Sequence, residues 1–334
     1  MSPVLRTRYL GLDLSGPVIA SASPLTGRLD DLMRLEDAGA AAVVLPSLFE
    51  EEVIEEEEVL QHHLEQGAGS FAESIDFFPD MPELELGPER HLRLLQEAKA
   101  RLNVPVIASL NAVHPGSWQR YAGEFVEAGA DAIELNLYSL ATDPTKDAAA
   151  VEAAYLEVIA AVRKAVTVPL AVKLSPYLSS ASHFAAAAVA AGVDGLVLFN
   201  RFYTPDLDLT TFGVAPTLEL STSADLRLPL RWIGVLRPQL TGTSLAATSG
   251  VHTAADVAKA LLVGADVACM TSALLLHGPE HVGAVLDGLE AWLEENLYES
   301  VDQLRGSASA AGVADPGGFE RAQYVRLLTE ARRH

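Results

Sequence analysis

Residues 126–135 of this chain are Val-Glu-Ala-Gly-Ala-Asp-Ala-Ile-Glu-Leu: the end of a helix, a glycine, and then a short apolar run. Related stretches recur at 36–45, 190–199 and 262–271. In each copy the glycine stands where a helix needs a left-handed residue at its carboxyl end. The apolar run that follows has the length of a strand buried on both faces. Four copies of this unit predict a parallel sheet built from alternating strands and helices. The four glycines are Gly39, Gly129, Gly192 and Gly264.

Extending the pattern outward from these copies gives a complete set of barrel elements. The predicted strands are 17–21, 41–45, 104–110, 133–137, 168–174, 196–200, 245–248 and 267–271. The predicted helices are 29–38, 88–102, 118–128, 148–166, 180–191, 253–263 and 279–296. The sequence therefore predicts an α/β fold, a (β/α)8 TIM barrel, whose chemistry lies at the carboxyl ends of the strands.

Three segments interrupt the alternation of strands and helices. We expect the barrel to occupy residues 1–305, with insertions near 60–87 and 201–228. Both insertions follow strands, and long loops in a compact fold usually carry function. Residues 306–334 are expected to form a linker and a C-terminal helix, the helix at 319–332.

Composition limits the partners and the compartment of the protein. The 334 residues carry a formal net charge of -22 at pH 7, so nucleic acid and anionic membranes are not expected as partners. No apolar run reaches the roughly 18 residues that a membrane span needs. Cys269, the one cysteine, predicts a buried structural thiol and a cytoplasmic protein. The acidic run at 50–58 predicts a solvated helix face, and no metal site is expected.

Polar residues follow the predicted strands at their carboxyl ends, although the strands themselves are almost wholly apolar. Burying polar groups costs free energy unless they are paired, so a ring of them at one end of a barrel indicates a ligand site. The members of this ring are Ser23, Ser47, Asn111, Asn136, Lys173, Asn200, Thr248–Gly250 and Thr271–Ser272.

Lys173 and two small-residue turns carry the clearest chemistry in this ring. Lys173 interrupts an apolar strand, where it can act as a fixed cation against a developing anion or else extend to solvent. The turns at Thr248–Gly250 and Thr271–Ser272 lead into helices, where barrels frequently bind phosphate. Ordinary capping of those helices is the alternative.

A proton carrier is less well defined by the sequence. Asn136 can both donate to and accept from a planar amide ring, and Ser139 follows it on the same loop. A lone serine is a weak base and needs a relay, so His114 is an alternative proton carrier. Surface or capping roles are expected for His62, His63, His252 and His277.

Five segments, in order along roughly residues 5–300, resemble the dihydroorotate dehydrogenase family, which are FMN-dependent β/α barrels. The resemblance implies that Lys173 contacts the flavin ring and that Ser139 holds the position of the base. It also implies a set of flavin, phosphate and substrate contacts. The segments are 16–23, 134–139, 172–176, 247–251 and 271–274. The implied flavin contacts are Ala22, Ser23 and Lys173; the phosphate contacts are Thr248, Ser249, Gly250, Thr271 and Ser272; the substrate contacts are Asn111, Asn136 and Asn200.

The chain departs from this family on the substrate side. Leu45-Pro46-Ser47 replaces the lysine that usually ends the second strand, and the asparagine-rich substrate loop is not recognisable within 67–87. Leu140-Ala141 replaces Pro-Asn after Ser139. Arg201 stands where a small hydroxyl residue is usual, and it can bind a substrate carboxylate through two hydrogen bonds.

The function expected from these residues is that of an FMN-dependent dehydrogenase, which oxidises dihydroorotate or a related CH–CH substrate by hydride transfer to the flavin. Two alternatives remain: a flavin-free aldolase or isomerase that uses Lys173, and a non-catalytic flavin-binding subunit. The chain has no cysteine cluster for an iron–sulfur centre. A soluble electron acceptor or a partner subunit is therefore expected, and a homodimer is possible.

Overall fold

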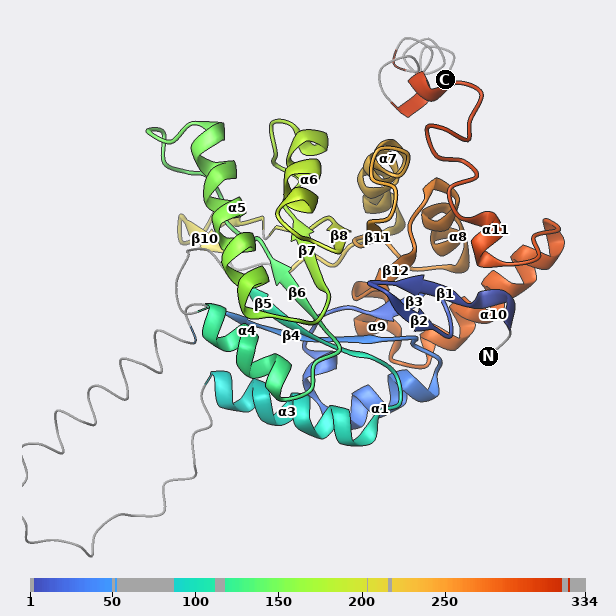
Figure 1. The fold of residues 1–334 in the computed structure, drawn as a ribbon, viewed down its shortest axis with the longest axis horizontal. Helices are drawn as coiled ribbons and strands as arrows, with labels where there is room; N and C mark the ends of the chain where they lie inside the picture. Colours follow the sequence, from blue (N-terminus) through green and yellow to red (C-terminus); the bar gives the residue numbers. More distant parts are fainter. Residues whose placement is uncertain are drawn as a thin grey trace, which may run out of the picture.

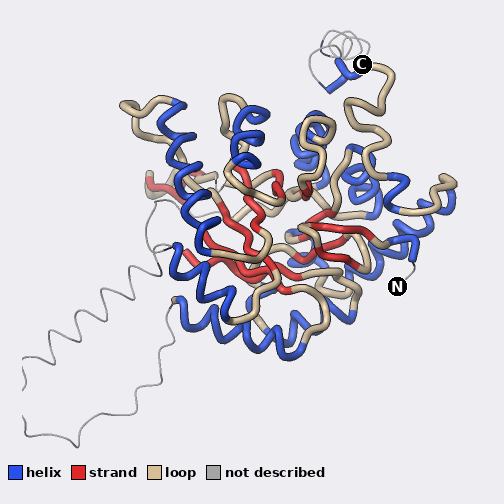
Figure 2. Tube along the Cα trace, in the orientation of Figure 1, coloured by secondary structure: helices blue, strands red, loops and turns tan. Residues whose placement is uncertain are grey.

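A closed barrel of eight parallel strands forms the centre of the molecule, and its helices surround it (Figures 1 and 2). The computed structural model describes residues 3–49, 52, 87–111, 118–202, 204–215, 218–319 and 324. The barrel closes in the order β11-β12-β3-β4-β5-β6-β7-β8, which confirms the predicted TIM barrel. Its strands are β3 (Val18–Ala20), β4 (Val43–Phe49), β5 (Val106–Asn111), β6 (Ala132–Asn136), β7 (Leu170–Leu174), β8 (Gly195–Leu198), β11 (Ser244–Ala247) and β12 (Val267–Met270).

The helices predicted between the strands are all present and pack around the barrel. All four glycines of the repeated unit have positive φ, between 100° and 114°, so each supplies the left-handed residue that its helix end needs. Within the described residues, three further α-helices have no counterpart among the predicted ranges: α7 (Arg227–Leu236) and the short helices α9 (Ser272–His277) and α11 (Val301–Leu304). The predicted helices are α1 (Leu29–Asp37), α3 (Pro88–Arg101), α4 (Trp118–Glu127), α5 (Ala148–Ala165), α6 (Ala181–Ala190), α8 (Ala254–Val263) and α10 (His281–Glu295).

An N-terminal hairpin closes the amino end of the barrel, a feature that the sequence analysis did not predict. Strands β1 (Thr7–Tyr9) and β2 (Leu12–Leu14) pair antiparallel outside the barrel sheet. Tyr9, Leu10 and Leu14 are buried in one cluster with the side chains that fill the barrel interior. A larger apolar layer between the strands and the helices forms the rest of the core. The short helix η1 (Pro3–Leu5) precedes the hairpin, and η2 (Leu25–Gly27) follows β3.

The segment after β8, expected as an insertion, contains regular structure. Strands β9 (Asp206–Asp208) and β10 (Gly213–Ala215) form an exposed antiparallel hairpin. A single turn, η3 (Ser223–Leu226), then leads into α7. Leu226, Ile233 and Leu236 are buried, so α7 packs against the barrel as an ordinary barrel helix.

The segment expected as a linker lies against the outer helices. The N–H of Gly306 donates to the carbonyl of Leu261 in α8, and the N–H of Ala310 donates to the carbonyl of Gly234 in α7. The short helices α11 (Val301–Leu304) and η4 (Pro316–Phe319) flank these contacts. Apart from Phe319 and Tyr324, the expected helix at 319–332 lies outside the described residues. The insertion at 60–86 and all of the acidic run except Glu52 lie outside them as well.

Candidate active site

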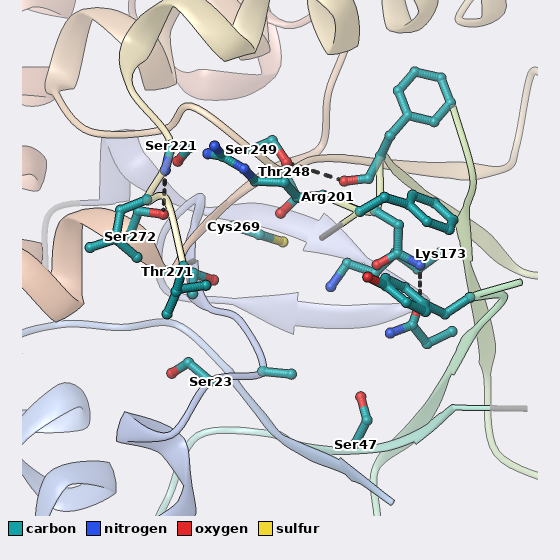
Figure 3. A pocket seen from close by; sticks show the side chains of 18 of the residues that line it. Ser23, Ser47, Lys173, Arg201, Ser221, Thr248, Ser249, Cys269, Thr271 and Ser272 are labelled. Atoms are coloured by element: carbon teal, nitrogen blue, oxygen red, sulfur yellow. Dashed lines mark hydrogen bonds between the residues drawn. The ribbon is translucent and has the colours of Figure 1, made fainter. Parts of the chain in front are cut away.

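A cavity of about 840 Å³ opens at the carboxyl end of the barrel (Figure 3). Its volume lies in the upper part of the ~300–1,000 Å³ range of small-molecule sites. All but one of the predicted site residues line it. They are Ala22, Ser23, Asn111, Asn136, Lys173, Asn200, Arg201, Thr248, Ser249, Gly250, Thr271 and Ser272.

Strand alternation explains why these side chains converge. On β7, Ala171 belongs to the cluster that fills the barrel interior, so Lys173, two residues later, points to the same inner face. On β6, Ala132 belongs to that cluster, so Glu134 and Asn136 also point inward. The register pairs Asn136 with Lys173 on the neighbouring strand, which brings the two residues side by side.

Lys173 is buried in an ion pair and does not extend to solvent. Its Nζ lies 3.2 Å from Oε1 of Glu134 and 3.5 Å from Oγ of Ser21. Lys173 is 8% exposed and Glu134 is 2% exposed, so water screens the pair only weakly. Sequence analysis gave Glu134 no role. The sequence does indicate where Glu134 points. It stands two residues before Asn136 on an apolar strand, and side chains two residues apart on a strand share a face.

The floor of the cavity beneath this pair is strongly desolvated. Burial raises the pKa of the Cys269 thiol to about 12; the negative charge of Glu134 adds to the rise and Lys173 opposes it. Burial, together with the charges of Cys269, Glu134 and Asp266, also raises the pKa of Tyr9, on the N-terminal hairpin, well above its usual value. Cys269 is therefore the buried structural thiol that the sequence predicted, although it also lines the cavity.

At the opposite side of the cavity, two turns meet through one serine that the sequence analysis missed. Ser249 and Gly250 both have left-handed φ, 70° and 82°, in the turn between β11 and α8. Ser221 Oγ accepts from the N–H of Gly250 at 3.3 Å, and the N–H of Ser221 donates to Oγ of Ser272 at 3.1 Å. Ser221 thus ties the two predicted phosphate turns together. It lies in an irregular stretch of polar residues, where no periodicity marks it.

The start of α8 beside these turns is held by Asp256. Burial alone would raise the pKa of this carboxyl, but hydrogen bonds from Ser223, Thr253 and His252 lower it below its usual value. His252 contacts the other side of this network, with Nε2 3.2 Å from Oγ of Ser221. Burial is the main cause that lowers the pKa of His252, so this imidazole is neutral at neutral pH.

Neutral amides and aromatic rings line the third part of the cavity. The side-chain amide of Asn200 donates to Oδ1 of Asn136, which fixes the two amides relative to each other. The rings of Tyr138 and Phe202 stack with centroids 4.4 Å apart, and Tyr177 meets Phe202 edge to face. Tyr138 and Phe202 both line the cavity, so a planar ligand here would meet amides and an aromatic wall.

Ser139 is the predicted site residue that does not line the cavity. It lies half-buried on the loop after β6, where its carbonyl accepts a hydrogen bond from the hydroxyl of Tyr155 at 2.9 Å. The alternative proton carrier, His114, lies outside the described residues, as do His62 and His63. Within the described part of the chain, no group of three or more histidine, cysteine or acidic side chains is arranged to hold a metal ion. No helix in that part combines the length and hydropathy that crossing a bilayer requires.

Together the fold and the cavity define a β/α-barrel enzyme with a polar ligand site at the carboxyl ends of its strands. The model of the dihydroorotate dehydrogenase family matches residues 88–293, well over half of the chain. The protein belongs to this family. It is an oxidoreductase of the kind that acts on CH–CH groups.

Comparison with curated proteins gives distant relatives along most of the chain. The NAD-dependent dihydropyrimidine dehydrogenase subunit PreA of Escherichia coli is 24% identical over 324 residues, covering 91% of this chain and 77% of the relative. The catalytic subunit of dihydroorotate dehydrogenase B (NAD(+)) of Methanothermobacter thermautotrophicus is 27% identical, covering 91% and 98%. The chloroplastic dihydropyrimidine dehydrogenase (NADP(+)) of Arabidopsis thaliana is 22% identical, covering 91% and 76%.

Proposed function

We propose that the protein is an FMN-dependent dehydrogenase that oxidises dihydroorotate or a related reduced pyrimidine by hydride transfer to the flavin. The carrying observation is that one cavity holds a buried lysine at one side and two linked small-residue turns at the other. The lysine suits the polar edge of a flavin ring, and the two turns suit the phosphate at the end of the ribityl chain of FMN. The family match supports a dehydrogenase over a flavin-free aldolase or a non-catalytic subunit.

The residues present fit FMN. The left-handed turn at Ser249–Gly250 and the start of the ten-residue helix α8 lie together at one side of the cavity, the kind of place where barrels bind phosphate. Ala22, Ser23 and Thr248 line the cavity between the turns and Lys173. A bound flavin supplies the acceptor for the hydride. Lys173 would hold a fixed positive charge beside that ring, in a site where water screens the charge little.

The substrate side of this proposal rests on uncharged groups. Asn111, Asn136 and Asn200 offer amide donors and acceptors of the kind that a pyrimidine ring carries. The hydrogen bond between Asn136 and Asn200 orients both amides before substrate arrives. Ser139 is kept as the proposed proton acceptor because the resemblance to the family puts it at the position of the base, and the Ser139→Ala variant tests this role.

We further propose that the electrons leave through a partner subunit or another soluble acceptor. Two of the relatives are named as subunits of NAD-dependent enzymes, which supports a partner for this chain. A cytoplasmic location and a homodimer are part of the same proposal. Size measurement of the purified protein, alone and after co-expression with flavin reductase subunits, checks the assembly.

The first test is a visible absorption spectrum of the purified protein under anaerobic conditions. We expect a yellow protein that bleaches on addition of either dihydroorotate or dihydrouracil, the carboxylated and uncarboxylated reduced pyrimidines. The Lys173→Met variant should bleach far more slowly, or lose the flavin, because the reduced ring loses its counter-charge. The proposal would be contradicted if denaturation released no FMN, as judged by the absorption spectrum of the supernatant, and if the protein took up no added FMN. Trapping of Lys173 by borohydride with a carbonyl compound would favour the aldolase alternative instead.

A further inference from the structure

Two cations line the cavity within the described part of the chain, and they lie in different surroundings. Lys173 is paired with Glu134 on the barrel floor. Arg201 follows β8, and its Nη1 lies 3.8 Å from Oδ2 of Asp225 on η3. In Figure 3 the side chain of Arg201 runs toward Ser221 and Ser249, away from Lys173. The guanidinium group therefore lies on the side of the cavity that carries the two turns.

The turn at Gly250 and the segment that holds Asp225 are in direct contact. A Cβ atom at Gly250 would overlap the backbone nitrogen of Leu226, and it would lie 2.9 Å from the carbonyl oxygen of Thr222. Ser221 adds the hydrogen bonds to Gly250 and Ser272. Because Asp225 lies within this packed segment, the position of Arg201 beside Asp225 is also a position beside the turn.

Asp225 orients Arg201 without using up its donors. Oδ2 of Asp225 already accepts from the N–H of Thr222 at 2.7 Å, in the capping box that starts η3. The 3.8 Å separation from Arg201 is an ion pair without a hydrogen bond. Across the described residues, the guanidinium group donates no hydrogen bond, so its planar fork of N–H groups is available to a ligand.

We propose that Arg201 binds the phosphate group of the flavin and makes the site selective for FMN over flavins that lack a phosphate. This inference rests on the proposed flavin function. It also differs from the role in substrate binding that the sequence suggested for Arg201. A phosphate monoester carries between one and two negative charges at neutral pH, and a guanidinium fork matches two of its oxygens. His252 is neutral there, and the chain carries a net charge of -22. The positive charge of Arg201 offsets part of a negative field that repels phosphate.

The proposed role of Arg201 differs from that of the backbone N–H groups near the phosphate site. Backbone N–H groups of the turn and of α8 supply partial charges in fixed directions. Arg201 supplies a full charge and two parallel hydrogen bonds, which are among the stronger polar contacts in proteins. With Arg201 at the phosphate, a substrate would still meet the neutral amides of Asn111, Asn136 and Asn200. Lys173 at the floor is the other cation of the described lining, which also includes the carboxylates of Asp206 and Glu219.

The test is to measure binding of FMN and of riboflavin to the apoprotein by fluorescence quenching. The variant Arg201→Met keeps most of the side-chain length and removes the charge. We expect it to bind FMN about 10- to 100-fold more weakly, from the usual strength of a charged hydrogen bond. Riboflavin, which has no phosphate, should bind the variant and the wild type equally. Arg201→Lys should recover part of the FMN affinity.

Arg227→Met is the matched control, because it removes the same charge from an exposed residue of the same segment that does not line the cavity. It should leave both affinities unchanged. An Arg201→Met variant that binds FMN as tightly as the wild type, or that loses FMN and riboflavin in equal measure, would overturn the phosphate role. A wild-type apoprotein that binds neither flavin would overturn the proposed function itself, and this inference with it.

Discussion

Glu134 and Lys173 form a buried pair of opposite charges on neighbouring strands, and the two residues should act on the flavin in opposite directions. Lys173 was predictable from the sequence because a lysine inside an apolar strand is conspicuous. The position of Glu134 on the strand indicates an inward side chain, but its ion pair with Lys173 was not predictable, because that pair depends on how the two strands are aligned. Ser221 carried no signal at all, since it acts through contacts with turns that are distant in the chain.

Glu134→Gln should raise the midpoint potential of the bound flavin, and Lys173→Met should lower it. Removing the carboxylate leaves the positive charge of Lys173 uncompensated, which favours the anionic reduced ring; removing the lysine has the reverse effect. Glu134→Gln should also reduce the free energy of unfolding by about 3–5 kcal/mol, because it leaves a buried charge without a partner. Spectroelectrochemical titration and urea unfolding measure the two effects.

The double variant Glu134→Gln/Lys173→Met is the control for this pair. It removes both charges, so it should recover part of the lost stability relative to Glu134→Gln alone. Two single variants that shift the potential in the same direction would contradict an electrostatic role for the pair.

Cys269 should be unreactive toward thiol reagents in the folded protein. The reactive species is the thiolate, and burial raises the pKa of this thiol to about 12, so very little thiolate is present at pH 8. Because the chain has one cysteine, release of thionitrobenzoate from Ellman's reagent reports this thiol alone. We expect slow reaction that accelerates in denaturing urea. Rapid reaction under native conditions would mean that the cavity floor is open to water.

At the scale of elements, the barrel was predictable because its unit repeats along the chain. Each copy has a glycine at the end of its helix and then a buried strand. Each copy alone is weak evidence for this unit, but the four copies support one another. The hairpins β1–β2 and β9–β10 have strands of three residues, too short to show a period. Helix α7 was missed because polar residues precede it and Pro229 lies in its first turn. Both obscure the apolar face, whose buried residues include Ile233 and Leu236.

Gly250→Ala should abolish tight FMN binding, because the turn cannot hold a side chain. An added Cβ meets the backbone of Leu226 and Thr222, neither of which can move as a flexible side chain would, and φ at this position is 82°. Gly242→Ala is the control: its φ is 96°, but nothing lies within 4 Å of the added Cβ. It should cost only about 1 kcal/mol of stability and leave FMN affinity unchanged. Equal effects of the two substitutions on FMN affinity would show that the turn does not contact the phosphate.

The whole molecule is a barrel with one closed end. The hairpin β1–β2 packs Tyr9, Leu10 and Leu14 against the barrel interior, while the cavity opens at the opposite end of the sheet. Among the described residues, the cavity opens at the end of the barrel opposite the hairpin, so we expect substrate and electron acceptor to reach the flavin by this same opening. The oxidised product must leave before an electron acceptor can approach the flavin along the same route. Initial rates at several acceptor concentrations should therefore give parallel double-reciprocal lines, the signature of ping-pong kinetics; intersecting lines would require a separate path for the electrons.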